Sequence, residues 1–331
     1  MRAVVCEAWG APQSLRIGEL PLPEPGPGQV RVRVHAAAVN FPDALMVAGK
    51  YQYRPELPFA PGLEFSGVVS AIGEGVDTLH PGDKVAGTAT HGAFAEQVLA
   101  EAGHLVVLPA DTGDEALALA GSFLLTYGTS WHALKDRAQA KAGETLLVLG
   151  AGGGVGLAAV ELGKRLGLRV IAAASSQDKR EAARAHGADA TIDSQAEDFR
   201  DQVRAHAGKG GVDIVYDPVG GALTETALRT LAWGGRHLVV GFAAGDIPKV
   251  PANLLLLKGT ALLGVFWGEF VRREPAASAA NTHQLLEWLR EGALQPMVSQ
   301  RYPLSQAPAA LAALLARQAV GKLLVLPQQA D

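Results

Sequence analysis

Five glycines fall within seven positions of the stretch LLVLGAGGGVGLAAV, residues 146–160. Four apolar residues precede the glycines, and the pattern that follows them is typical of a helix. A glycine-rich turn between a strand and a helix can bind phosphate, because backbone N–H groups gather there at the positive end of the helix dipole. The alternative is a tight turn that binds nothing. A second apolar strand, RVIAAA, follows at the spacing of a βαβ unit, so the surrounding elements favour phosphate binding.

The fingerprint G-x-G-x-x-G of dinucleotide-binding loops fits residues 151–156, in which alanine replaces the first glycine. Gly153 would let the backbone approach a pyrophosphate, and Gly156 would let the helix pack close to the strand. The first helical turn, which contains Gly154 and Val155, would hold the anion through its N–H groups. We therefore predict a dinucleotide-binding site at this turn.

The end of the second strand indicates which dinucleotide binds. Ser175 and Ser176 stand where an acidic residue would bond the ribose 2′-hydroxyl, and Lys179 and Arg180 follow them. Hydroxyls and cations suit a 2′-phosphate, which a carboxylate would repel, so we predict NADPH rather than NADH. Asp178 is the competing candidate, but we expect it on the following helix, facing solvent. The alternative for the two cations is a solvated helix start.

Two parts of the chain carry different patterns around this site. Residues 1 to about 115 contain short apolar or alternating segments separated by Gly and Pro, which predicts a small, barrel-like β domain. Helices and strands then alternate as βαβαβαβ, the pattern of a doubly wound parallel sheet. We therefore predict an α/β fold with a catalytic domain of residues 1–120 and 263–331 and a nucleotide domain of residues 121–262. The apolar residues 252–268 predict buried strand segments.

Composition excludes several classes of function. The 331 residues are 48% hydrophobic and 19% charged, with a net charge of −4 and no cluster of Lys and Arg, which argues against nucleic acid as a partner. No signal peptide and no transmembrane span is recognised, so we expect a cytoplasmic protein without a membrane partner. The single cysteine, Cys6, excludes an intrachain disulfide and a four-cysteine zinc site.

Four phrases together resemble those of a known family. AAAVNFPDALMVAGKY, LPFAPGLEFSGVV, GAGGGVG and YDPVGG are similar to segments of the medium-chain dehydrogenase/reductase superfamily, and most similar to its zinc-free NADPH:quinone oxidoreductase branch, the zeta-crystallin-like proteins. The resemblance covers nearly the whole chain. It implies a β-rich GroES-like catalytic domain and a Rossmann nucleotide-binding domain. It also implies an NADPH-dependent reductase that transfers hydride to quinones or related conjugated carbonyls.

The resemblance also identifies what is missing for a metal site. Zinc-dependent alcohol dehydrogenases of the superfamily carry a catalytic Cys where this chain has Asn40, and a ligand His where it has Leu63. Catalytic zinc needs about three protein ligands, so no metal is predicted. None of the nine histidines stands in an H-x-H or H-E-x-x-H arrangement. Without a Lewis acid, quinones and other conjugated acceptors are the favoured substrates, because they need little charge stabilisation on oxygen.

Two residues are implied as catalytic, Asn40 and Tyr51. In the active cleft that the resemblance predicts, Asn40 could hydrogen-bond the nicotinamide ribose or the acceptor oxygen. Tyr51 matches the tyrosine of a G-x-Y motif that approaches the cofactor in quinone reductases. It also resembles the proton-donating tyrosine of enoyl-thioester reductases. The alternatives are a turn cap for Asn40 and a packed aromatic ring for Tyr51.

Further cofactor contacts are implied by the same resemblance. Thr129 is similar to a threonine near the nicotinamide, and Ser194 stands at the adenine end, where relatives often place an aromatic residue or histidine. The resemblance also implies that the backbone of two further segments binds the carboxamide and ribose of the cofactor. The first segment is Val240, Gly241 and Phe242, and the second is Val265, Phe266 and Trp267.

Two other functions remain open at this point. One is a 2-enoyl-thioester reductase in which Tyr51 donates the proton; it would need cations for an acyl carrier, for which Arg54 is the nearest candidate and Arg272 with Arg273 a more distant one. The other is a structural or RNA-binding protein that binds NADPH without turnover. The partner we expect is a small-molecule conjugated acceptor. A homodimer is expected by analogy, paired through an edge strand around residues 250–268.

Overall fold

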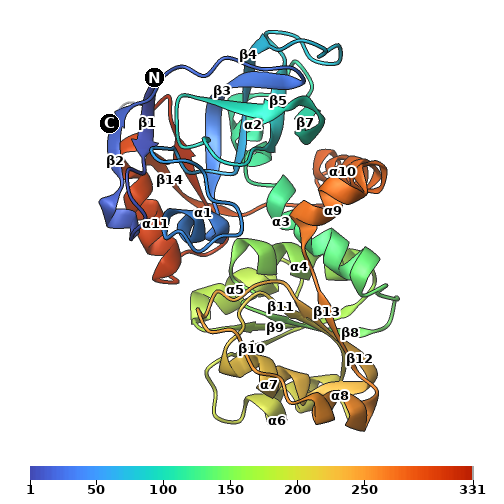
Figure 1. Ribbon diagram of the computed structural model, residues 1–331. Coiled ribbons are helices and arrows are strands. Elements are labelled where there is room, and N and C mark those ends of the chain that lie inside the picture. Colours follow the sequence, from blue (N-terminus) through green and yellow to red (C-terminus); the bar gives the residue numbers. More distant parts are fainter. Residues whose placement is uncertain (330–331) are drawn as a thin grey trace. The chain divides into compact units, whose positions relative to one another are not determined.

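The computed structural model describes residues 1–329, which form two compact units (Figure 1). Unit 1 consists of residues 1–125 and 298–329, and unit 2 of residues 126–297. The second boundary differs from the predicted one at residue 263. The chain stays in unit 2 for longer, because three further elements pack there before the chain returns. They are β13 (Ala261–Gly264), α9 (Trp267–Arg273) and α10 (Pro275–Arg290).

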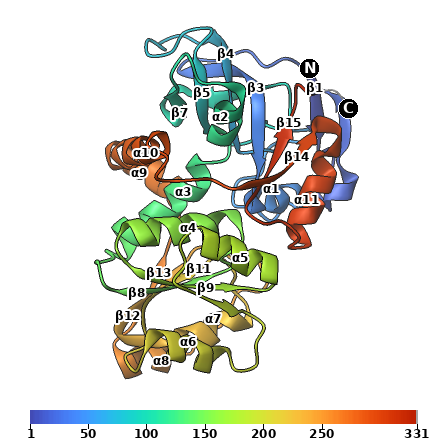
Figure 2. The same ribbon diagram turned by 180° about the vertical axis from the view of Figure 1, so that it is seen from behind.

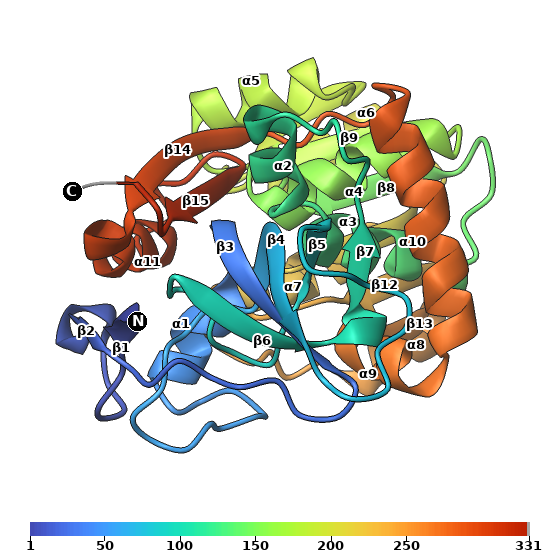
Figure 3. The same ribbon diagram turned by 90° about the horizontal axis from the view of Figure 1, so that it is seen from above.

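Unit 1 is built on a seven-stranded sheet of order β14-β15-β3-β4-β5-β7, in which β6 also pairs with β3 (Figure 3). All neighbours are antiparallel except β14 and β15. The bounds are β3 (Gln29–Val39), β4 (Glu64–Ile72), β5 (Lys84–Thr88), β6 (Gln97–Glu101), β7 (Leu105–Val107), β14 (Val298–Pro303) and β15 (Lys322–Leu326). A separate ribbon pairs β1 (Arg2–Val5) with β2 (Arg16–Glu19). The predicted β-rich domain is confirmed.

The side chains of β3 alternate between the two faces of the sheet, and those on one face pack into the core of unit 1. Val30, Val32 and Val34 point to one face and are fully buried, as the period-two pattern predicts. The helices of unit 1 are α1 (Phe41–Val47), α2 (Asp114–Ala120) and α11 (Ala307–Leu315). The next helix, α3 (Leu124–Trp131), leads the chain into unit 2 and continues as a π-helical segment, His132–Arg137.

Unit 2 contains a six-stranded parallel sheet of order β10-β9-β8-β11-β12-β13. The strands before β13 are β8 (Thr145–Leu149), β9 (Arg169–Ala174), β10 (Ala190–Asp193), β11 (Val212–Asp217) and β12 (Leu231–Val239). Figures 1 and 2 show α4 and α5 on one face of the sheet and α6, α7 and α8 on the other. These helices are α4 (Gly154–Arg165), α5 (Gln177–Ala185), α6 (Phe199–Ala207), α7 (Ala222–Leu228) and α8 (Ala252–Lys258). This is a doubly wound Rossmann sheet, as predicted.

The order of the strands reverses between β8 and β11, and ligands of such sheets bind at the carboxyl ends of the strands near this point. Both strands are covered by helices on both faces, which explains their continuous apolar runs. Leu146 to Leu149 are fully buried, and so are Ile214 to Tyr216. The glycine-rich turn follows β8 directly.

The prediction of buried strands over residues 252–268 is wrong for its first half. Those residues form α8, which ends at Gly259 in a left-handed conformation. Leu256 and Leu257 are 80% and 68% exposed. In the second half the strand is confirmed for β13, the last strand of the sheet, which among the described residues pairs with β12 alone. The predicted burial is wrong there too, because the residues of β13 are partly or fully exposed, and α9 begins at Trp267. No helix in the described part of the chain is long and apolar enough to cross a membrane.

Candidate active site

The glycine-rich turn has the geometry of an anion cradle. Gly150 directly follows β8 and has a φ of +61°, and Gly153 is the N-cap of α4. A Cβ at Gly156 would lie 2.3 Å from the carbonyl oxygen of Gly150, so only glycine lets α4 begin this close to the turn. At Gly153 the nearest atom to such a Cβ is 3.6 Å away. The backbone of the turn is therefore open where a pyrophosphate would approach the first N–H groups of α4.

Lys179 lies directly over this turn. A Cβ at Gly152 would come 2.4 Å from the Cβ of Lys179, so the lysine on α5 and the glycine after β8 are in contact. Ser175 and Ser176 are exposed at the start of α5, and Ser176 is the N-cap of this helix, its Oγ accepting from the Lys179 N–H at 3.4 Å. The structure therefore brings the stem of Lys179 against the glycine turn, with the two serines just before it in the chain.

The other predicted cation has partners within unit 2. Arg180 donates to the carbonyl oxygen of Ala174 at 3.1 Å and pairs with Asp193 at 3.2 Å. Asp178 lies in the first turn of α5 and is exposed, as expected. Of the charged residues after β9, Lys179 is the one that the structure places against the glycine turn.

The backbone N–H groups of the loop after β12 donate to backbone carbonyl oxygens of the same unit. Val240 and Gly241 both donate to the carbonyl oxygen of Asp217, at 2.9 and 3.3 Å, and Val265 donates to Val239 at 2.9 Å. A carboxamide could therefore be received here by carbonyl oxygens rather than by these N–H groups. Phe242 follows in the same loop, and its carbonyl oxygen accepts from Gly245.

The remaining predicted contacts are divided between two places in unit 2. The ring of Trp267 packs on α3, because a Cβ at Gly128 would lie 2.8 Å from it, and Thr129 is the next residue of that helix. Phe266 precedes Trp267 and is 54% exposed. Ser194 follows β10 and lines an open cavity of about 680 Å³, whose other walls come from α6 and α7.

Asp217 anchors a loop that sequence reasoning did not single out, although it lies in the phrase YDPVGG. Its Oδ1 accepts from the N–H groups of Val219 and Gly220, both at 2.9 Å, and its Oδ2 accepts from Thr224 Oγ1 at 2.6 Å. His237 Nε2 lies 3.0 Å from the same Oδ2. Burial opposes ionisation, but these hydrogen bonds hold the pKa of Asp217 below its ordinary value.

This anchored loop supports the glycine turn. A Cβ at Gly150 would lie 2.9 Å from Cγ2 of Val219, so the two loops touch at the carboxyl edge of the sheet. The hydrogen bonds of Asp217 therefore hold the loop against which the glycine turn packs.

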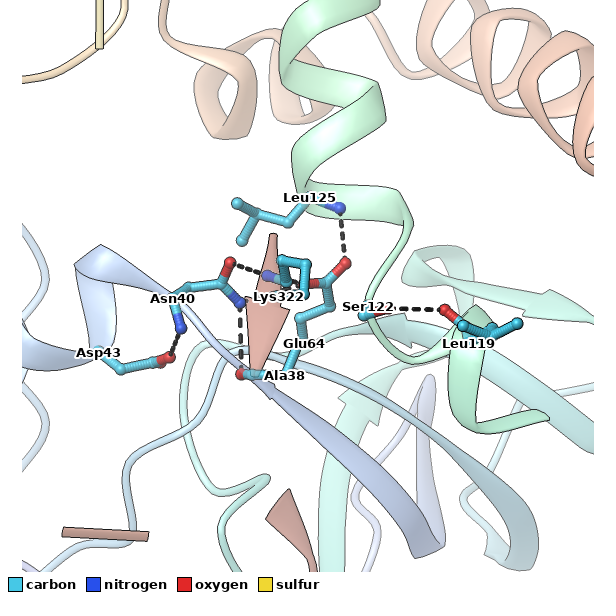
Figure 4. Close-up of polar contacts among 8 residues, drawn as sticks. All are labelled: Ala38, Asn40, Asp43, Glu64, Leu119, Ser122, Leu125 and Lys322. Carbon is cyan, nitrogen blue, oxygen red and sulfur yellow. Dashed lines mark hydrogen bonds and ion pairs between the residues drawn. The ribbon is translucent and has the colours of Figure 1, made fainter. Parts of the chain in front are cut away.

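A second polar cluster surrounds Asn40 in unit 1 (Figure 4). Its Oδ1 accepts from Lys322 Nζ, and its Nδ2 donates to Glu64 Oε2 at 3.1 Å and to the carbonyl oxygen of Ala38 at 3.3 Å. Lys322 also donates to Glu64 Oε2 at 3.2 Å, and Glu64 Oε1 accepts from the Leu125 N–H at 2.8 Å. All three polar side chains are buried. We name Asn40, Glu64 and Lys322 the polar triad.

Asp43 and Tyr51 flank the polar triad. Asp43 is fully buried in the first turn of α1, and its Oδ2 accepts from the Asn40 N–H at 2.7 Å. Burial raises the pKa of Asp43 to about 7, although the Asn40 N–H and the charge of Lys322 oppose this rise. Tyr51 is half-buried against the core of unit 1. Burial and the charge of Asp43 raise its pKa, so the Tyr51 hydroxyl keeps its proton at neutral pH.

The donor groups near Asn40 do not fit zinc. The two positions that carry zinc ligands in the alcohol dehydrogenases hold an amide and an aliphatic side chain, and the Lys322 ammonium is bonded to both Asn40 and Glu64. A metal ion would meet a positive charge here and lack thiolate and imidazole donors. Among residues 1–329, no group of three or more His, Cys, Asp or Glu side chains is arranged to hold a metal ion.

Two family models match this chain. Residues 26–110 match the alcohol dehydrogenase GroES-like domain, and residues 154–287 match the zinc-binding dehydrogenase model. Quinone oxidoreductase-like protein 2 of Mus musculus is 36% identical over 325 residues, which cover 98% of this chain and 91% of the mouse protein. The chain belongs to the quinone oxidoreductase branch of the medium-chain dehydrogenase/reductase superfamily. The predicted family is confirmed, and the chain is an oxidoreductase of this branch.

Solved structures of this branch have the same fold. A mycobacterial protein in complex with NADPH matches with a TM-score of 0.91 and 33% identity, covering 99% of this chain and 100% of that one. The quinone oxidoreductase of Escherichia coli, also complexed with NADPH, matches with a TM-score of 0.91 and 26% identity over the same shares. The GroES-like and Rossmann architecture predicted from sequence is confirmed.

Proposed function

We propose that this oxidoreductase uses NADPH, works without zinc and reduces quinones or related conjugated carbonyls. The observation that carries the proposal is Lys179, which lies over Gly152 in the glycine turn beside two exposed serine hydroxyls. A lysine and hydroxyls at this point would bind a 2′-phosphate, and an acid suited to the 2′-hydroxyl of NADH is missing from positions 174–176. The NADPH complexes of the mycobacterial and Escherichia coli relatives support the same choice.

When bound, NADPH supplies the hydride. The chain's own residues then have three tasks. The first N–H groups of α4, at Gly154 and Val155, hold the pyrophosphate; Asp217 keeps the neighbouring loop in place; and Tyr51 carries a proton that it can donate. The raised pKa of Tyr51 suits a donor, because the neutral phenol is the form present at pH 7.

The polar triad supports zinc independence. The Lys322 ammonium is bonded to Asn40 and Glu64, and no group of three or more His, Cys, Asp or Glu side chains within the described residues is arranged to hold a metal ion. An acceptor that is already electron-poor needs no Lewis acid to take up hydride, whereas an unactivated ketone does. The acceptor class we propose is therefore a quinone or another conjugated carbonyl.

A second candidate function is the reduction of 2-enoyl thioesters. The observation that favours it is the Tyr51 hydroxyl, to which no residue within 1–329 makes a hydrogen bond, so that its proton can go to a substrate carbon. The cations for an acyl carrier argue against it. Arg272 and Arg273 are both paired with Glu269, at 2.5 and 2.6 Å, which leaves Arg54 as the exposed candidate.

The test is oxidation of NADPH by the purified, chelator-treated protein, with 1,4-naphthoquinone and crotonyl-CoA in parallel and NADH as the cofactor control. We expect turnover of the quinone with NADPH, undiminished by chelation. Turnover of crotonyl-CoA that is lost in Tyr51→Phe would instead establish the enoyl reductase. Tight NADPH binding with no turnover of either acceptor would support a binding protein.

We also propose that the protein forms a homodimer through β13. This strand has an unpaired edge, and the apolar side chains around it are exposed. They include Leu262 and Phe266 near the edge and Leu256 and Leu257 on α8. A second copy that pairs its own β13 would extend the sheet and cover this surface.

A further inference from the structure

Lys322 is a buried lysine bonded to Asn40, which is one of the two residues expected to be catalytic. It is the first residue of β15, where it is 5% exposed, and the four residues after it are apolar. Lysine is almost never buried in this way unless it is paired. Its ammonium reaches Asn40 Oδ1 and Glu64 Oε2, and both partners are buried.

Stability alone does not explain this lysine. Removing an ammonium and a carboxylate from water costs several kcal/mol per ion by general estimates, and apolar side chains of similar size often give an equal or greater stability. A Met or Leu at position 322 would continue the apolar pattern of β15, which packs beside β3. A buried pair kept at such a cost points to a role in the arrangement of its neighbours.

The arrangement in question is the orientation of the Asn40 amide. An ammonium can only donate hydrogen bonds, and an ionised carboxylate can only accept them. Lys322 must therefore face Oδ1 of Asn40, and Glu64 must face Nδ2, as the hydrogen bonds show in Figure 4. A flipped amide would put Nδ2 against the ammonium and Oδ1 against the carboxylate. Both contacts would then be repulsive.

We propose that Lys322 is a positioning residue, which together with Glu64 fixes the Asn40 amide in one orientation. This inference rests on the proposed reductase function, in which Asn40 orients the acceptor or the nicotinamide ribose. Lys322 acts through Asn40 and does not itself touch a substrate. The charges facing Lys322 are those of Glu64 on β4 and of Asp43 on α1.

The first measurement reads the amide directly and needs no turnover. The chain has three asparagines, Asn40, Asn253 and Asn281, so selective ¹⁵N-asparagine labelling gives three side-chain amide signals. Asn40→Ala assigns one of them. We expect the Asn40 amide protons to exchange with solvent about tenfold faster in the double variant Lys322→Met/Glu64→Gln than in the wild type.

The double variant is chosen because Lys322→Met alone would leave Glu64 as an unpaired buried charge and could prevent folding. Glutamine can both donate and accept, so the double variant removes the orientation preference that Lys322 and Glu64 impose and leaves only the hydrogen bond from Nδ2 to the Ala38 carbonyl oxygen. Asn281 is the internal control, since its Nδ2 donates to Asp136 Oδ2 at 2.9 Å and its exchange should not change. Unchanged exchange at Asn40 would overturn the proposal.

The second measurement separates positioning from general structure. With NADPH and the acceptor that the wild type turns over, we expect kcat of the double variant to fall about tenfold while the Kd for NADPH changes less than about threefold. In an Asn40→Ala background the same two substitutions should cause little further loss, because the residues act as one unit. If the two substitutions lower kcat in the Asn40→Ala background by the same factor as in the wild type, the proposal would be overturned.

Lys84→Met is the matched control for loss of a structural lysine. Lys84 lies in unit 1 and donates to the carbonyl oxygens of Ala110 and Thr112, without any contact to the polar triad. We expect it to lower thermal stability and leave kcat unchanged. If the wild type shows no turnover, the proposed reductase function would be overturned. The exchange of the Asn40 amide protons would still decide whether Lys322 orients Asn40.

Discussion

Lys179 lies against Gly152, so closely that a methyl group on the glycine would overlap the Cβ of the lysine. The contact joins the helix after the second strand of the nucleotide sheet to the glycine turn after the first. It places the stem of a lysine on the turn that we propose to hold the pyrophosphate. We propose that this lysine favours NADPH over NADH.

Gly152→Ala should displace Lys179 and weaken NADPH binding. The added Cβ would come 2.4 Å from the Cβ of Lys179, so either α5 or the turn must shift. We expect the Kd for NADPH to rise about tenfold, or about 1.4 kcal/mol, as measured by fluorescence titration. Gly103→Ala is the control, because a Cβ there meets no atom within 4 Å. An unchanged Kd in Gly152→Ala would mean that the contact is not part of the site.

Lys179→Gln should remove the preference for NADPH without impairing NADH. A hydrogen bond to a charged group contributes about 1.5 to 3 kcal/mol, so the Kd for NADPH should rise by about one to two orders of magnitude. The Kd for NADH should stay the same, because NADH has no 2′-phosphate. Asp178→Asn should leave both constants unchanged. A weaker NADH affinity in Asp178→Asn would show that this acid binds the ribose.

Asp217→Asn should destabilise unit 2 by about 2 to 3 kcal/mol in urea denaturation at neutral pH, since it weakens charged hydrogen bonds with Thr224 and His237. The pKa of Asp217 is lowered in the folded protein, and an unfolded aspartate titrates at about 3.9. Its stabilising contribution is therefore present above about pH 4 and is lost as the pH falls through the folded pKa. Wild type and variant should converge in acid. A difference that does not depend on pH would exclude ionisation of Asp217 as the cause.

Asp43→Asn should change the pH dependence of stability in the direction opposite to that expected for Asp217→Asn. The folded pKa of Asp43 is about 7, above its unfolded value, so ionisation destabilises the fold. The wild type should lose stability as the pH rises from about 4 to about 7, by about 3 to 4 kcal/mol at most, and the variant should lack this loss. Chemical denaturation at about pH 4 and about pH 7 measures this change in the free energy of unfolding. If that free energy changes equally with pH in the wild type and in the variant, the raised pKa of Asp43 would be contradicted.

Leu262→Lys should convert the proposed dimer into a monomer. Leu262 lies in the edge strand β13 and is 38% exposed, and a lysine there would place a charge against its copy in the second chain. Sedimentation velocity measures the change in mass. Leu22→Lys, at an exposed leucine in a loop of unit 1, is the control. A monomeric wild type would overturn the proposed pairing.

Elements with a strong local pattern could be predicted from the sequence. The apolar run before the glycines became β8, and the alternating valines became β3. Residues 252–268 were harder, because a run of leucines suits a buried strand and an apolar helix equally well. Only the position at the end of the sheet explains why α8 leaves two leucines exposed. Arg180 shows the same limit, since it lies on the helix α5 and its partner Asp193 lies on the strand β10.

The sequence by itself determined the doubly wound sheet and the glycine turn, because these depend on residue types and on spacings within one element, where neighbours interact at fixed intervals. The family and the loss of the Cys and His ligands of zinc came from the resemblance of four phrases in the sequence to known proteins. The tertiary structure decided which charges meet. Lys322 reaches Asn40 across 282 residues because β15 pairs with β3, and Lys179 reaches Gly152 because β9 lies beside β8. The energy of a buried charge depends on its contacts, and no local pattern contains them.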